Sequence, residues 1–296
     1  MTQAVIDAHH HIWRQADLPW LAGPMVPRIF GPYEPIRRDY GIEEYLADIA
    51  GEGVVKSVYV QANWAPENAV AEARWVEAEA DRSGWPHAIV AYADLMADDV
   101  RPTLDGLAEV PRVRGIRMQL HWHENPQYRF APHGGVADDP VFRRNLAALA
   151  DYGFSFDLQV FAPQMEGAAR LAADHPETTF VLQHAGMLED LTDRGREEWC
   201  RGMRLLSAQP NVTAKLSGLG TFIHANDPAH VAWIVRETVD MFGPRRCLFG
   251  SNFPIEKLWT DYGSLLGAHR DAMAGFSAED RAAMLHDTAA RVYRLR

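Results

Sequence analysis

The sequence predicts a single α/β domain of the (β/α)8 TIM-barrel type, and three observations lead to this prediction. Short β-branched runs alternate with longer amphipathic patterns along almost the whole chain. Eight such runs occur, which is the number of parallel strands in a barrel of this kind. The length of 296 residues is ordinary for one barrel, and no change of composition marks a second domain within residues 1–296.

The predicted strands are short runs rich in valine, isoleucine and aromatic residues. They cover residues 5–9, 57–61, 88–93, 115–120, 154–160, 178–183, 212–216 and 246–250. Parallel strands are joined by right-handed crossovers, so a repeated unit of strand and helix closes naturally into a barrel. An open doubly wound sheet is the alternative fold, but the first strand lacks the Gly-x-Gly-x-x-Gly turn of its nucleotide-binding form.

Helical periodicity fills the connections between these strands. The predicted helices cover residues 42–50, 67–82, 100–108, 140–152, 164–174, 196–208 and 229–242, and two more follow the last strand at 265–274 and 278–295. Pro66 and Pro140 suit first helical turns, whereas Gly84, Gly153 and Gly243 stand where a left-handed residue would end a helix.

The connection after the first strand, residues 14–41, is unusually long and rich in proline. Loops of this length in compact domains are usually functional or disordered. The aromatic and basic residues of this loop favour an ordered lid over a flexible linker; they are Trp20, Arg28, Phe30, Tyr33, Arg37, Arg38 and Tyr40.

Composition limits the classes of partner. The net charge of -11 argues against nucleic acid and anionic membranes, because either would need a basic face. No apolar run approaches the length of a membrane span, and residues 1–4 lack the basic region of a signal peptide, so we expect a cytoplasmic protein that acts on a small molecule. A homo-oligomer stays open. Cys200 and Cys247 are too few for a disulfide framework and are expected as buried thiols.

The first strand runs into the sequence Asp7-Ala8-His9-His10-His11. Alternate side chains of a strand face the same way, so the spacing predicts that His9 and His11 point together to one side with Asp7 beneath them. Two imidazoles on a rigid strand can hold a divalent cation or polarise a carbonyl group. A chance cluster at a loose N-terminus is the alternative, but apolar residues flank the histidines on both sides. We expect Asp7 to orient the pair or to accept a backbone hydrogen bond.

The carboxyl ends of the strands carry the chemistry in a (β/α)8 barrel, because the loops that follow them meet on one face. Polar and aromatic residues stand at every predicted strand end. In chain order they are His9, His11, Gln61, Trp64, Asp94, Arg117, Gln119, His121, Trp122, His123, Asp157, Gln159, His184, Lys215 and Asn252.

Several of these residues belong to short motifs at the strand ends. The motifs are His9-x-His11, Gly115-Ile116-Arg117, Gln183-His184-Ala185-Gly186, Lys215-Leu216-Ser217-Gly218 and Gly250-Ser251-Asn252-Phe253-Pro254. As a set they resemble the signature of the amidohydrolase superfamily and, more narrowly, of its sugar-lactonase-like branch, which includes L-fuconolactonase and 2-pyrone-4,6-dicarboxylate lactonase. The resemblance spans essentially the whole chain and implies a TIM barrel, a hydrolase of cyclic esters, and catalytic roles for His9, His11, His184 and Asn252.

Two departures from the family pattern bear on the mechanism. Relatives generally carry aspartate where this chain has Asn252, and an amide cannot accept the proton that the carboxylate takes from water. The predicted fifth strand also lacks the lysine that forms the carbamylated bridge of two-metal members. We therefore expect at most one divalent ion, zinc or manganese, held by His9, His11 and His184. Metal-free operation is an equal alternative.

Five further residues are candidates for substrate binding. Arg117 can hold a carboxylate with its planar guanidinium or can neutralise Asp94 or Asp157. For Lys215 a structural ion pair is favoured over substrate contact. The remaining candidates are Gln61 and the two indoles, which can stack on a flat or sugar-like ring or can simply pack: Trp64 and Trp122. We place the polar loop that follows the fourth strand outside the catalytic set: His121, His123, Tyr128 and Arg129.

The sequence thus predicts hydrolysis of a lactone, or a related cyclic ester, of a small sugar acid or a carboxylated ring compound. The general base is left open among His184, Asp94, Asp157 and Glu256. A lactone isomerase is one alternative, because the substrate's own hydroxyl then attacks and no water needs activation at Asn252. A catalytically inactive binding barrel is the other.

Overall fold

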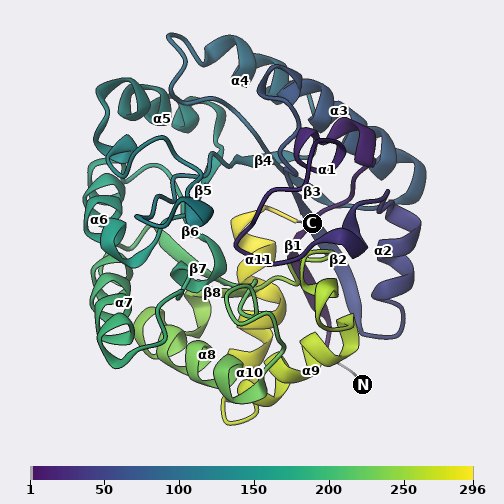
Figure 1. Ribbon diagram of the computed structural model, residues 1–296, viewed down its shortest axis with the longest axis vertical. Coiled ribbons are helices and arrows are strands. Elements are labelled where there is room, and N and C mark those ends of the chain that lie inside the picture. Colours follow the sequence, from purple (N-terminus) through teal and green to yellow (C-terminus); the bar gives the residue numbers. More distant parts are fainter. Residues whose placement is uncertain (1–2, 296) are drawn as a thin grey trace.

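A computed structural model describes residues 3–295 as an eight-stranded parallel barrel surrounded by helices (Figure 1). Neighbouring strands pair in sequence order, as expected for the predicted fold, which is confirmed. Met1, Thr2 and Arg296, which the predicted domain includes, lie outside the described residues. The strands are β1 (Val5–His10), β2 (Val54–Val60), β3 (Ala88–Ala91), β4 (Val113–Ile116), β5 (Ser155–Leu158), β6 (Phe180–Leu182), β7 (Val212–Leu216) and β8 (Cys247–Phe249).

Backbone hydrogen bonds between the first and last strand segments close the barrel. The amide of Asn252 donates to the carbonyl of His9 at 2.7 Å, and the amide of His11 donates to the carbonyl of Phe253 at 2.8 Å. The two motifs that the sequence singled out at opposite ends of the chain are thereby fixed side by side.

The predicted helices are present, with boundaries that differ by a few residues, except that the one predicted at 278–295 is divided by a π-helical segment at Ala283–Asp287. Gly84 and Gly153 end their helices in the left-handed conformation as predicted, but Gly243 has a φ of 77° with an extended ψ of 151°, so it is not a left-handed helical cap. The helices are α1 (Pro19–Ala22), α2 (Ile42–Asp48), α3 (Ala69–Ser83), α4 (Arg101–Ala108), α5 (Pro140–Tyr152), α6 (Met165–Asp174), α7 (Asp193–Ser207), α8 (Pro228–Phe242), α9 (Tyr262–Ala272), α10 (Ala278–Ala282) and α11 (Thr288–Val292).

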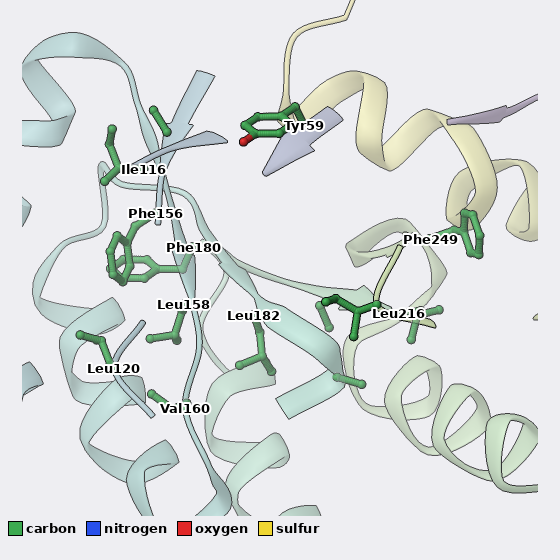
Figure 2. Packing of buried hydrophobic residues seen from close by; sticks show 14 of the residues in the cluster. Tyr59, Ile116, Leu120, Phe156, Leu158, Val160, Phe180, Leu182, Leu216 and Phe249 are labelled. Carbon is green, nitrogen blue, oxygen red and sulfur yellow. The ribbon is translucent and has the colours of Figure 1, made fainter. Parts of the chain in front are cut away.

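Two layers of apolar packing hold the barrel together. Outside the strands, a large buried cluster packs the sheet against the helices, and Figure 2 shows part of it around Phe156, Phe180 and Leu182. Inside the strands, a smaller cluster includes Ile6 and Ala8 and packs against Tyr293, just beyond α11. Residues of α11 and the following Tyr293 therefore pack against the inner side chains of the strands.

Strand β1 departs from the predicted alternation. The inner cluster contains Ile6 and Ala8, so Asp7 between them faces the surrounding helices, and the register between β1 and β2 is irregular from Asp7 to His10. The Asp7 carboxylate accepts hydrogen bonds from the hydroxyls of Tyr45 on α2 and Tyr262 on α9. The prediction that Asp7 lies beneath the histidine pair on the same face is therefore wrong. Its expected role as a backbone acceptor is correct, because it also accepts the amide hydrogen of His9 at 3.1 Å.

The long loop after β1 is an ordered lid, as predicted. The Trp20 indole of α1 donates to the carbonyl of Ala62 at 2.9 Å, which ties the lid to the end of β2. Arg37 donates to the carbonyls of Leu21 and Gly23 and so holds the two halves of the loop together. No helix within residues 3–295 has both the length and the apolar character needed to cross a bilayer.

Candidate active site

A cavity of about 390 Å³ lies at the carboxyl ends of the strands, beneath the lid. Its floor is built from strand ends that include His11, Arg117, His184 and Asn252. Lid residues cover it from the other side: Trp20, Val26, Pro27, Arg28, Ile29 and Phe30. Its volume lies in the usual range for a small-molecule site.

Three histidine rings lie close together at this end of the barrel: His11 and His184 line the cavity, whereas the predicted catalytic residue His9 is fully buried next to them and does not line it. The His9 ring lies 5.1 Å from the His11 ring and 4.8 Å from the His184 ring, measured between centroids. Burial, followed by the charge of Lys215, holds the pKa of His9 well below its usual value. Burial and Arg117 likewise lower the pKa of His11 well below its usual value and that of His184 to about 3. All three imidazoles are therefore neutral at physiological pH, so each offers one N–H donor and one lone-pair acceptor instead of a positive charge.

The protonation of His11 follows from its partner. Its Nδ1 lies 2.6 Å from the carbonyl oxygen of Val60, which can only accept. Nδ1 therefore carries the proton, and Nε2 is left as a lone-pair acceptor. The Nδ1 of His184 lies 3.0 Å from the hydroxyl of Ser217, which can donate or accept.

His184 is held in a backbone conformation that favours glycine. Its φ is 52°, in the left-handed region that a non-glycine residue adopts only when its surroundings enforce it. Gly218 also has a positive φ, of 60°, and a Cβ at that position would stand 2.5 Å from the His184 Nδ1. The Ser217-Gly218 pair thus orients the imidazole with a hydrogen bond and leaves room for its ring.

Asn252 enters the cavity from a left-handed turn after β8, with a φ of 58°. Asparagine tolerates this conformation better than most residues. Behind it, the buried Glu256 carboxyl receives hydrogen bonds from the Asn252 side chain and, at 2.9 Å, from the Trp259 indole. Burial raises the pKa of Glu256 to about 8. At that pKa the group is mostly protonated at neutral pH, and it is not among the residues lining the cavity.

Arg117 lines the cavity with only 3% of its surface exposed. Its guanidinium donates to the carbonyl of Gln61 at 2.5 Å and to the Oε1 of Gln159 at 3.5 Å. Burial lowers its pKa to about 10, so it stays charged at neutral pH. Among residues 3–295, Arg117 forms no ion pair. The carboxylate of Asp157, one of the two that it could have neutralised, pairs with Lys215 instead. A buried, charged guanidinium without an anionic partner suits an anionic or polarised substrate oxygen.

Four of the predicted substrate-binding residues do not line the cavity. Lys215 forms the favoured structural ion pair, 2.8 Å from Asp157, and both side chains are fully buried. The side chain of Gln61 accepts from the amide of Asn63. The two indoles pack elsewhere: Trp64 against Trp75 and Trp122 beneath Arg129. A strand-end position fixes the edge of the barrel where a residue lies but not the direction of its side chain.

His121, which the sequence analysis placed outside the catalytic set, does line the cavity. It is 4% exposed, and its buried Nδ1 has no hydrogen-bond partner among the described residues. The sequence spacing could have identified His121 as a cavity residue. Arg117, Gln119 and His121 are two residues apart, which puts side chains on one face of an extended chain, and all three line the cavity. The lid residues Arg28 and Phe30 lie in a loop without periodicity, and no comparable signal identified them as cavity residues.

The predicted metal ligands His9, His11 and His184 are neighbours, with the His9 ring 5.1 Å from that of His11 and 4.8 Å from that of His184. Within residues 3–295, no group of three His, Cys, Asp or Glu side chains is arranged to hold an ion. His9 nevertheless has both ring nitrogens buried and without a partner in the described part of the chain, so it is the histidine with unused bonding capacity.

Comparisons with known proteins agree with this architecture. A family model described as amidohydrolase matches residues 6–295. The protein y4mH of Sinorhizobium fredii is 36% identical over 297 residues, which cover 99% of each chain. An L-fucono-1,5-lactonase of Burkholderia ambifaria is 29% identical over 295 residues, which cover 98% of this chain and 95% of that protein.

A solved structure extends the comparison to three dimensions. The crystal structure of an amidohydrolase from Burkholderia multivorans with bound zinc has a TM-score of 0.81 and 28% identity, and the match covers 99% of this chain and 100% of that one. The resemblance inferred from the sequence motifs is thus confirmed. Because the family model spans nearly the whole chain and lactonases align with it from end to end, this protein belongs to the amidohydrolase family, as a lactonase-like hydrolase.

Proposed function

We propose that this enzyme opens, by hydrolysis, the ring of a lactone derived from a small sugar acid or a carboxylated ring compound. The observation that carries the proposal is the convergence of two neutral imidazoles, a buried guanidinium and an amide on one cavity: His11, His184, Arg117 and Asn252. The L-fucono-1,5-lactonase relatives support the class of reaction.

In this proposal the carbonyl oxygen of the lactone lies beside Arg117 and His184. Attack by water turns that oxygen into an oxyanion, and fixed donors in a site shielded from solvent stabilise such a charge strongly. Arg117 supplies the positive charge. His184 supplies an Nε2–H donor in the tautomer whose Nδ1 accepts from Ser217.

The acceptor for the proton of water is His11 Nε2, since the bond to Val60 fixes the proton on Nδ1. Its lowered pKa makes it a weak base, so it takes the proton only as negative charge develops on the neighbouring carbonyl oxygen. When the tetrahedral intermediate collapses, the ring C–O bond breaks and His11 returns the proton to the departing alkoxide. Asn252 orients the water or this alkoxide through its amide, and it takes no proton itself.

The steps above use the protein's side chains alone; a bound ion would be held by His9, His11 and His184 and would polarise the lactone carbonyl. The zinc in the related Burkholderia multivorans structure makes zinc the first ion to test, and manganese is the other ion expected from the sequence.

Lactone isomerisation is the second candidate, and Asn252 is the observation that favours it. If the substrate's hydroxyl attacks the carbonyl, no water has to lose a proton at this position. The two reactions are separated by following sugar lactones with NMR, because hydrolysis yields an open acid and isomerisation a second ring. Hydrolysis predicts the open acid and proton release. A wild-type enzyme that only interconverts five- and six-membered rings would overturn the proposal, and a lack of both reactions across neutral and carboxylated lactones would favour the inactive barrel.

A further inference from the structure

The charged residues that line the cavity are all arginines. They are Arg28 from the lid, Arg117 from the end of β4, and Arg129 from the loop that follows; within the described chain no aspartate, glutamate or lysine side chain joins them. The protein as a whole carries 40 acidic against 29 basic residues. The charged groups of the cavity are therefore all positive, although the chain as a whole has a net charge of -11. A cleft with such a local positive potential attracts anions.

The three guanidinium groups differ in what they already bind. Arg129 is exposed, and it donates to the backbone carbonyls of His123 and Glu124, which shapes its own loop. Arg117 sits among the catalytic groups and donates to Gln61. Like Arg117, Arg28 belongs to no ion pair within residues 3–295 and has a buried Nε without a hydrogen-bond partner there, but it lies on the lid and not on the cavity floor. A buried donor without a partner is unfavourable unless a ligand supplies the acceptor.

The Arg28 side chain is supported by an aromatic ring. Its guanidinium carbon lies 5.4 Å from the centre of the Trp20 ring, and Trp20 is itself tied to the carbonyl of Ala62. This cation–π contact restrains the guanidinium, and the absence of an ion pair within residues 3–295 leaves its N–H groups available to a planar, bidentate anion.

The backbone on both sides of Arg28 is also anchored. The carbonyl of Arg28 accepts from the side chain of Gln127, and the carbonyl of Ile29 lies 3.1 Å from the Nε2 of His224. These anchors come from the loops that follow β4 and β7. These two loops therefore hold the lid from two sides and keep Arg28 over the cavity.

We infer that Arg28, stacked on Trp20, binds a carboxylate that the substrate carries at the end remote from its reacting carbonyl. The inference rests on the proposed function and narrows it: the lactone is an anion rather than a neutral sugar lactone. Arg117 then serves the carbonyl at the floor, and Arg28 serves the carboxylate beneath the lid.

The test compares two lactones that differ only at C6. D-glucaro-1,4-lactone carries a carboxylate there, and D-glucono-1,4-lactone carries a hydroxymethyl group. We expect wild type to have the higher kcat/KM for the carboxylated lactone, and Arg28→Gln to lower that preference by about tenfold or more, mainly through KM. Arg28→Lys, which keeps the charge and loses the planar fork, should lie between them.

Arg196→Gln is the matched control, because Arg196 also stacks on an indole, 4.5 Å from the Trp233 ring, but lies outside the cavity lining. It should leave the preference unchanged. An Arg28→Gln variant that keeps the wild-type preference, or a wild type that prefers the neutral lactone, would overturn the inference.

A binding measurement separates failure of this inference from failure of the proposed function. D-glucarate, which has no ring to open, should raise the Tm of wild type and of Arg196→Gln but not of Arg28→Gln. If wild type hydrolyses neither lactone and the Tm pattern still holds, the hydrolase proposal fails and the carboxylate site stands. If the lactones are hydrolysed and D-glucarate shifts Tm equally in all three proteins, the carboxylate site is wrong.

Discussion

The Nδ1 of His184 lies 2.5 Å from the point where a Cβ on residue 218 would stand. Gly218 is therefore required for two reasons, its positive φ of 60° and the space it leaves for the imidazole. His184 follows β6 and Gly218 follows β7. The position of the His184 ring at the end of β6 therefore depends on the absence of a side chain at the end of β7.

Replacing Gly218 with alanine should lower kcat/KM strongly and the free energy of unfolding only moderately. The new methyl group pushes the His184 ring out of the cavity, and we expect kcat/KM to fall by roughly 100-fold, comparable to the loss of one oxyanion donor. Backbone strain should lower the free energy of unfolding by about 1–3 kcal/mol. Kinetics on folded protein and urea unfolding measure the two effects. Alanine at Gly267, which has no atom within 4 Å of its virtual Cβ, is the control, and equal losses in both variants would contradict the assigned role.

Arg117→Lys tests the proposed oxyanion partner. The substitution keeps the positive charge but loses the planar fork that reaches Gln61 and the cavity together. We expect kcat/KM to fall about tenfold or more while Tm stays within a few degrees of wild type. A large drop in Tm with unchanged kinetics of the folded fraction would instead make Arg117 a purely structural residue.

The role of metal can be decided by analysing and depleting the purified enzyme. Because the three histidines as positioned form no ion-holding group, we expect activity to survive dialysis against a chelator and metal content to be substoichiometric. His11→Asn keeps a donor for the Val60 carbonyl and removes the Nε2 acceptor, so it should abolish activity without changing metal content. Stoichiometric zinc or manganese that leaves together with activity would show that the side chains rearrange around an ion.

The buried carboxyl group of Glu256 should make the free energy of unfolding depend on pH. Burial raises its folded pKa from 4.5 to about 8, so the folded state binds the proton more tightly than the unfolded state. Its contribution to stability is fully present below about pH 4.5 and is lost as pH rises through about 8. Relative to Glu256→Gln, wild type should therefore lose up to about 1.4 kcal/mol of unfolding free energy per pH unit between these values.

Urea unfolding of wild type and Glu256→Gln from pH 5 to pH 9 checks this prediction. The same series on Glu67→Gln, an exposed glutamate before α3, controls for the general effect of pH. A constant difference between wild type and Glu256→Gln across the range would show that the carboxyl is not protonated in the folded enzyme.

The barrel was predictable because its signal is local, whereas much of the site depends on distant contacts. Each strand and helix repeats its own hydrophobic period, and the ends of eight strands must meet. The irregularity in β1 instead depends on Asp7 bonding to Ser251 and Tyr262, more than 240 residues away in sequence. The directions of Trp64 and Trp122 likewise depend on tertiary packing, and Arg28 belongs to a lid whose path no sequence period specifies.

Asn252→Asp separates the candidate reactions. Asn252 stands beside the histidines in a left-handed turn that aspartate also tolerates, so we expect the variant to fold. If the enzyme is a hydrolase with His11 as proton acceptor, the new carboxylate adds a second acceptor, and the rate of hydrolysis should stay equal or rise. If it is an isomerase, the variant should form open acid at the expense of the isomerised ring. NMR of both proteins on sugar lactones distinguishes these products. Efficient wild-type hydrolysis that collapses in Asn252→Asp would contradict this expectation and would assign the amide N–H₂ an essential donor role toward the transition state.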